Sequence, residues 1–148
     1  MPPETPGPRS VLLITERYPP HEGGLARSSE RLARHAARYG AAVHVLVTRG
    51  EGAPGSLHST PSEGPGGGVW VHRLGSARTA ADGGQHAAHA LGWLHAQEGF
   101  DLLHGQYGST SGFLAAYHAR RLGISSYVSL RGNDLDRDVY DPARFPAL

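Results

Sequence analysis

The chain has 148 residues, of which 39% are hydrophobic and 18% charged, so we expect one globular domain with one core. Its net charge of +1 provides no strong attraction to nucleic acid or to a membrane surface. The sequence contains neither cysteine nor lysine, which excludes disulfides, thiolate metal sites, cysteine nucleophiles and any Schiff-base or P-loop lysine.

The beginning of the chain resembles a leader rather than a targeting signal. Residues 1–10 lack the apolar core of a signal peptide, and no apolar run approaches the length of a membrane span. We therefore expect a cytoplasmic protein with a flexible leader over residues 1–9 and a single domain over residues 10–148.

A β-α-β unit is predicted first along the chain. Ser10 to Thr15 is a short apolar run without polar alternation, which is typical of a strand buried on both faces of a parallel sheet. Leu25 to Tyr39 predicts a helix that ends at Gly40, and Ala42 to Thr48 predicts the second strand. The apolar face expected of this helix consists of Leu25, Leu32, Ala36 and Tyr39.

The rest of the chain continues the alternation after one interruption. Residues 49–68 hold seven glycines and three prolines, which predicts a long irregular loop. Further strands are expected over 69–74, 100–105 and 124–130, with helices over 84–98 and from about 109 to 122.

Because strands alternate with helices, we predict a Rossmann-like α/β domain, in which helices lie on both faces of a parallel sheet and the crossovers are right-handed. In such a sheet the loops that follow the strands lie along one edge, where ligands bind. The residue types that could perform chemistry concentrate in three of these loops, namely 16–24, 105–108 and 131–134.

The first of these loops ends in Gly23 and Gly24, directly before the first helix. Glycines let the backbone pass close to a ligand, and the positive end of a helix favours a phosphate. An ordinary strand-to-helix turn explains the same residues. The dinucleotide fingerprint G-x-G-x-x-G is absent, and Thr48 and Arg49 stand where an acidic residue would follow the second strand. An NAD-dependent enzyme is therefore disfavoured.

The second loop follows the strand that carries His104 and contains Gln106 between two glycines. A histidine at a strand end is placed to contact a substrate, although a structural histidine satisfied by its neighbours is equally compatible with the pattern.

The third loop is Arg131-Gly132-Asn133-Asp134. A guanidinium binds phosphate or carboxylate, and an aspartate accepts hydrogen bonds from sugar hydroxyls. A turn closed by an Arg–Asp ion pair is the alternative.

Together, the three loops resemble the N-terminal domain of the family-four retaining glycosyltransferases, which have the GT-B architecture. The first match runs from Tyr18 to Leu25 and continues into the helix with Leu32 and Ala33. The second is FDLLHG over 100–105, followed by SGFLAA over 111–116, and the third is GISSYVSLRGND over 123–134. The resemblance covers about residues 10 to 138.

The resemblance implies the N-terminal half of a GT-B fold and assigns roles to the loops. In the family, the Gly-Gly loop lies near the diphosphate and sugar of the donor, a role that falls here to Gly23 and Gly24. The positions of His104 and of residues 131–134 line the acceptor side of the cleft. The chain departs from the family at Arg131, where many members have histidine, and at Gln106, where a second histidine is frequent.

The expected function is the acceptor side of a retaining transfer of a sugar from a nucleotide-sugar donor, which is a substrate; no metal or other cofactor is implied. The family's second domain, which binds the donor nucleotide, is missing from the sequence, so we expect the isolated chain to be inactive. A separate C-terminal half or self-association is the expected protein partner. No catalytic residue is assigned. The candidate substrate- and phosphate-binding residues are Gly23, Gly24, His104, Gln106, Arg131, Gly132, Asn133 and Asp134.

A different class of function also fits the pattern: a non-catalytic Rossmann-like module that binds a phosphorylated ligand or a partner protein. Ligand binding without turnover, even after a C-terminal half is added, distinguishes this alternative from the glycosyltransferase. The sequence identifies neither the donor sugar nor the acceptor.

Overall fold

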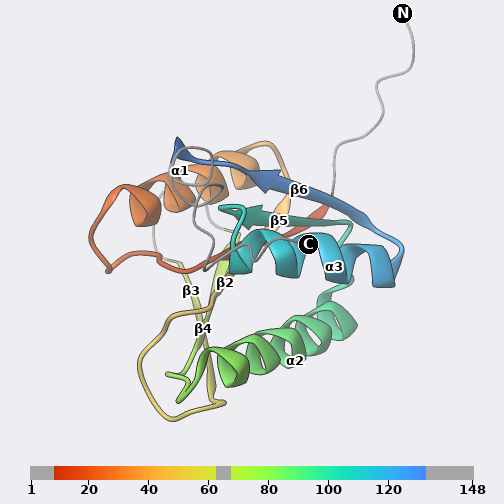
Figure 1. Cartoon of the computed structure of the whole chain (residues 1–148). Coiled ribbons are helices and arrows are strands. Elements are labelled where there is room, and N and C mark those ends of the chain that lie inside the picture. Colours follow the sequence, from red (N-terminus) through yellow and green to blue (C-terminus); the bar gives the residue numbers. More distant parts are fainter. Residues whose placement is uncertain (1–8, 63–67, 133–148) are drawn as a thin grey trace, which may run out of the picture.

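Six strands form one sheet in the order β3-β4-β2-β1-β5-β6 (Figure 1). The computed structural model of the protein describes residues 9–62 and 68–132. Neighbouring strands are parallel except β3 and β4, which pair antiparallel. The predicted Rossmann-like α/β class is confirmed. The strands are β1 (Ser10–Thr15), β2 (Ala42–Val47), β3 (Leu57–Pro61), β4 (Val69–Leu74), β5 (Leu102–Gln106) and β6 (Ser125–Ser129).

The helices of the described residues are α1 (Gly24–Arg38), α2 (Ala80–Glu98) and α3 (Thr110–Leu122). From β1 to β2 the chain moves one way across the sheet, and from β4 through β5 to β6 it moves the other way. Right-handed crossovers therefore place α1 on one face and α2 and α3 on the other. Figure 1 shows this division, with α2 and α3 together and α1 apart from them.

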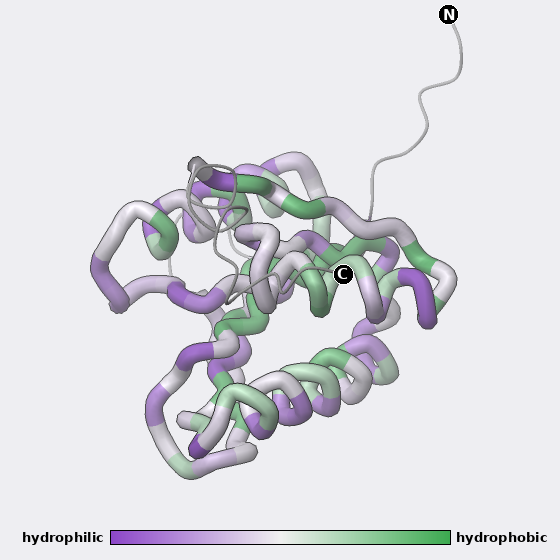
Figure 2. Tube along the Cα trace, in the orientation of Figure 1, coloured by the Kyte–Doolittle hydropathy of each residue, from purple (hydrophilic) through white to green (hydrophobic). Residues whose placement is uncertain are grey.

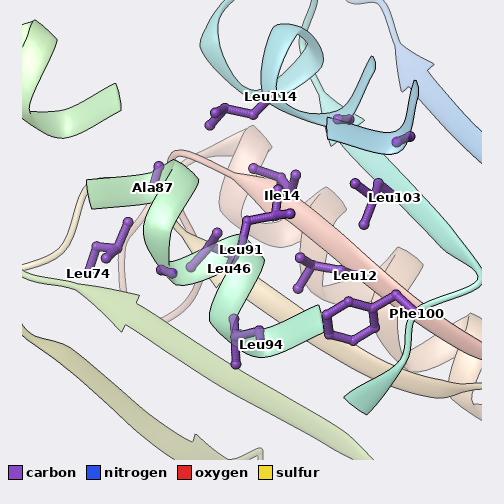
Figure 3. Packing of buried hydrophobic residues seen from close by; sticks show 13 residues of the cluster. Leu12, Ile14, Leu46, Leu74, Ala87, Leu91, Leu94, Phe100, Leu103 and Leu114 are labelled. Atoms are coloured by element: carbon purple, nitrogen blue, oxygen red, sulfur yellow. The ribbon is translucent and has the colours of Figure 1, made fainter. Parts of the chain in front are cut away.

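Each face of the sheet has its own buried cluster, because successive side chains of a strand point to opposite faces. On β1, Leu13 packs on the α1 side, whereas Leu12 and Ile14 pack against α2 and α3. Figure 3 shows Leu12 and Ile14 beside Leu91 and Leu94 of α2. Burial of each such leucine contributes about 1.5–3 kcal/mol. Figure 2 shows the hydrophobic residues along the central strands, while the helices alternate in polarity.

The predicted irregular loop over 49–68 is wrong at 57–61, which form the edge strand β3. Its pairing with β4 places Ser59 opposite His72, and the two side chains share a hydrogen bond of 2.7 Å. Pro61 is the last residue of β3. Because β3 is an edge strand, the amide hydrogen that proline lacks is not needed to pair with a further strand. Residues 63–67 of the predicted loop lie outside the described part of the chain.

The predicted apolar face of the first helix is confirmed for Leu32 and Ala36, which are partly buried against the core, but not for Tyr39. The fully buried residues of α1 are the small ones, Ala26, Ser29 and Ala33, whereas Tyr39 is 82% exposed. Small side chains let the helix approach the sheet closely, and the hydroxyl of Ser29 lies 3.1 Å from that of Thr15 on β1. The next helix, α2, begins four residues earlier than predicted.

That earlier start has a local cause. The side chain of Thr79 caps α2 by accepting a hydrogen bond of 3.1 Å from the backbone amide of Asp82. Within the described residues, no helix has both the length and the apolar character needed to cross a membrane.

Candidate functional site

The Gly23–Gly24 loop lies directly before α1 at the edge where the parallel strands end. Gly23 has φ 118°, a backbone conformation that favours glycine. A Cβ added at either glycine would meet no atom within 4 Å, so the space in front of this backbone is open. The guanidinium of Arg73 on β4 holds the loop by donating to the carbonyl of Pro19. The loop therefore presents an accessible helix N-terminus from a fixed position.

The sequence predicted that His104 lies at the end of its strand. In the structure it lies in the middle of β5, and Gln106 is the last residue of the strand. Both side chains belong to the sheet face that α1 occupies, since they alternate with Leu103, which packs against α3 and α2 on the other face. Gln106 is fully buried, whereas His104 is half-buried and lies edge-on to the ring of Tyr127 on β6.

Arg131 follows β6 and connects three elements. Its Nη2 donates to Oε1 of Gln106 at 2.9 Å and to the hydroxyl of Ser28 in α1 at 2.6 Å. Nε2 of Gln106 lies 3.3 Å from Nε2 of His104, and the same histidine nitrogen lies 2.8 Å from the hydroxyl of Ser129. One hydrogen-bonded network therefore joins the ends of β5 and β6 to Ser28 in the second turn of α1.

The network sets the charge of the histidine. Burial lowers the pKa of His104, and the nearby positive charge of Arg131 lowers that pKa further. His104 is therefore a neutral imidazole at pH 7, and Arg131 is the cation of the network. The first turn of α1 contains no acidic residue, and Glu22 directly precedes the N-cap residue Gly23.

Gly105 has a packing role rather than a ligand-facing one. A Cβ at this position would lie 2.5 Å from the carbonyl oxygen of Ser111 and 2.7 Å from Cα of Gly112. Any larger residue would push α3 away from β5. The glycine beside His104 is thus explained by the close approach of the helix.

The structure joins His104, Gln106 and Arg131 in one hydrogen-bonded network, whereas their binding of a substrate stays a prediction. Gly24 is the first residue of α1, and Ser28, which accepts a hydrogen bond from Arg131, lies about one turn further along the helix, so the first loop adjoins this network. Gly132 is exposed, and Asn133 and Asp134 lie outside the described residues.

Ser28 and Ser129 belong to the network but were not predicted. A single serine that belongs to no motif does not indicate a binding site in the sequence. Ser129 could have been found from strand register, because β6 pairs with β5 so that Ser129 stands beside Gln106.

An apolar groove of about 220 Å³ continues from His104 along the α1 face of the sheet. Its floor is formed by β1, β2 and β5 and its wall by α1. The groove is lined by Val11, Leu13, Leu32, Ala33, Ala36, Tyr39, Ala41, Val43, Leu102 and His104.

A second polar cluster lies on the opposite face of the sheet. Nδ1 of His44 on β2 is 2.9 Å from Nε2 of His72 on β4, and His72 in turn bonds Ser59. Nε2 of His44 lies 3.7 Å from a carboxylate oxygen of Glu98, at the end of α2. Within residues 9–62 and 68–132, no three His, Asp or Glu side chains are grouped closely enough to hold a metal ion.

Comparison with known proteins identifies a family. The model described as "Glycosyl transferase 4-like domain" matches residues 23–148. The comparison with curated protein sequences gives no match.

Two solved structures of sucrose-phosphate synthase from Thermosynechococcus elongatus are similar in fold. One aligns with a TM-score of 0.57 at 15% identity, covering 88% of this chain and 67% of that chain. The other aligns with a TM-score of 0.61 at 13% identity, covering 92% of this chain and 38% of that chain. This chain thus spans well under half of the second neighbour.

Proposed function

The chain belongs to the glycosyl transferase 4-like domain family, and from that premise we propose that it forms the acceptor-side half of the cleft of a retaining glycosyltransferase with a nucleotide-sugar donor. The observation that carries the proposal is the network in which Arg131 joins Gln106 of β5 to Ser28 of α1. It places a cation within about one helical turn of the open Gly23–Gly24 backbone.

A phosphate of the donor is the ligand that this arrangement favours. The amides at the start of α1, which no side chain caps in the described residues, and the helix dipole attract an anion. Arg131 adds a full positive charge on the same side. Gly23 and Gly24 leave room for the ligand to approach the backbone.

The acceptor is proposed to lie over His104 and Arg131. A neutral imidazole and a guanidinium both hydrogen-bond to hydroxyl or phosphate oxygens. The predicted binding roles of Gly132, Asn133 and Asp134, which follow Arg131 in the sequence, belong to this proposal; Asn133 and Asp134 lie outside the described residues. No catalytic residue is assigned, and no metal is required by it.

The donor nucleotide is proposed to be held by a second domain, outside these 148 residues, which cover 38% of the second sucrose-phosphate synthase structure. Under this proposal, residues 1–148 alone bind phosphorylated ligands weakly and transfer no sugar, because they supply only the acceptor side of the cleft. Transfer would need the other half, supplied by a longer chain or by a separate protein.

Thermal unfolding with added nucleotide-sugars and phosphosugars tests the binding step. A ligand at a hundred times its Kd stabilises the native state by about 2.7 kcal/mol, which raises the Tm by about 5–10 °C for a domain of this size. We expect this increase in the wild type and its loss in Arg131→Met. The matched control is Arg120→Met, since Arg120 is an exposed arginine on α3, on the other face.

Equal stabilisation of wild type and Arg131→Met would contradict the proposed site. Sugar transfer by the purified chain alone would contradict the need for a second half. Binding without transfer after a C-terminal half is supplied would instead identify a non-catalytic binding module.

A further inference from the structure

The direction of each hydrogen bond in the Arg131 network follows from one donor-only group. A guanidinium has no acceptor, so Arg131 must donate to Gln106. The atom of the amide that faces Arg131, at 2.9 Å, must therefore be the carbonyl oxygen Oε1. The opposite orientation would direct the amide hydrogens of Gln106 at a cation.

The orientation of the amide then determines which ring nitrogen of His104 carries the proton. With Oε1 facing Arg131, the NH₂ group of Gln106 faces Nε2 of His104 at 3.3 Å. An NH₂ group donates only, so Nε2 of His104 must accept. The hydroxyl of Ser129, 2.8 Å from the same nitrogen, can donate to it as well. A proton on Nε2 would oppose the amide donor directly.

We propose that Arg131, acting through the amide of Gln106, fixes His104 in the tautomer that carries its proton on Nδ1, so that His104 serves the acceptor site as a hydrogen-bond donor and not as a base. Its lone-pair nitrogen is occupied by protein donors. Its Nδ1–H group has no hydrogen-bond partner among residues 9–62 and 68–132 and is available to an oxygen atom of the substrate.

Gln106 is thus a positioning residue: it acts through His104, and its complete burial prevents water from replacing its amide. The lowered pKa of His104 agrees with an imidazole kept neutral. The ligand class follows from the donor, which suits a hydroxyl, phosphoryl or carboxylate oxygen. The use of this donor by a substrate rests on the proposed function, whereas the tautomer itself does not.

Nuclear magnetic resonance of the full chain with ¹⁵N-labelled histidine tests the tautomer, because two-bond proton–nitrogen correlations identify which ring nitrogen is protonated. At pH 7.5 and without ligand, we expect the Nδ1–H pattern for His104. Gln106→Glu introduces a carboxylate, which only accepts hydrogen bonds, and is expected to move the proton to Nε2 while keeping the pairing with Arg131. The matched control, Gln97→Glu on the exposed surface of α2, should leave the pattern of the wild type.

A wild-type Nε2–H pattern, or no change in Gln106→Glu, would overturn the inference. Should Gln106→Glu fail to give a dispersed amide spectrum, Arg131→Met provides the second variant. It removes the group that orients the amide and is expected to replace the single Nδ1–H pattern by exchange between both tautomers; retention of the pure Nδ1–H pattern there would also overturn the inference. Because no ligand is present, this outcome is independent of whether the chain binds a nucleotide-sugar.

Discussion

Acidification should weaken this fold through the buried histidine His72. His72 on β4 lies between His44 of β2 and Ser59 of β3, and both rings are more than 90% buried. Burial lowers the pKa of His72 to about 4, and repulsion by His44 acts in the same direction. The charge of Glu98, at the end of α2, raises the pKa of His44 but does not outweigh the effect of its burial.

The sign of the effect follows from where the proton binds first. The pKa in the unfolded chain is about 6.5, above the value in the folded protein, so the unfolded state takes up the proton first as the pH falls. The stability contributed by neutral His72 is complete above pH 6.5 and decreases between pH 6.5 and 4. At pH 4.5 the loss assigned to His72 is about 2.5 kcal/mol, a large part of the about 5–15 kcal/mol typical of a domain.

Urea unfolding of wild type and His72→Gln at pH 7 and pH 4.5 measures this loss, because glutamine keeps hydrogen-bonding groups but does not titrate. The wild type should lose about 2–3 kcal/mol more than the variant over that interval. His58→Gln on β3 is the control for removal of an exposed histidine from the same pair of strands. Equal losses in wild type and His72→Gln would refute the reasoning.

Three substitutions test the packing around the sheet, each by urea unfolding at pH 7. Gly105→Ala should destabilise by about 1–3 kcal/mol, because its Cβ would meet backbone atoms of α3; an unchanged stability would contradict the close approach of α3 to β5. Gly92→Ala, in α2 with no atom within 4 Å of the new Cβ, should stabilise by about 0.5–1 kcal/mol, and a destabilisation would indicate a contact that the structure lacks. Leu91→Ala should cost about 2–5 kcal/mol, since Leu91 is fully buried under the sheet; a cost below about 1 kcal/mol would contradict that burial.

Much of the fold could be predicted from local pattern. The apolar run at 10–15 has no polar alternation because β1 is central and buried on both faces. The order of strands and helices then restricted the sheet to a few topologies. β3 could not be predicted, because its residues are polar and lie among glycines and prolines. Only pairing with the open side of β4 makes them a strand.

The candidate site was predictable to the level of its loops but not of its contacts. Residue type and strand-end position indicated His104, Gln106 and Arg131. Ser28 could not be found this way, because its partner is 103 residues away in the chain and meets it only through the packing of α1 on the sheet. The burial of α1 by small residues was missed for a similar reason: hydrophobic periodicity identifies large apolar side chains, whereas the close helix–sheet contact selects Ala26 and Ser29.

Chemical-shift mapping of backbone amides, with a nucleotide-sugar titrated into the ¹⁵N-labelled chain, tests the proposed function most directly. The account predicts saturable shifts concentrated at Gly23, Gly24 and Ser28 near the start of α1, at Gln106, the last residue of β5, and at Arg131 after β6. The absence of any saturable shift, or shifts confined to α2 and α3 on the opposite face, would contradict it.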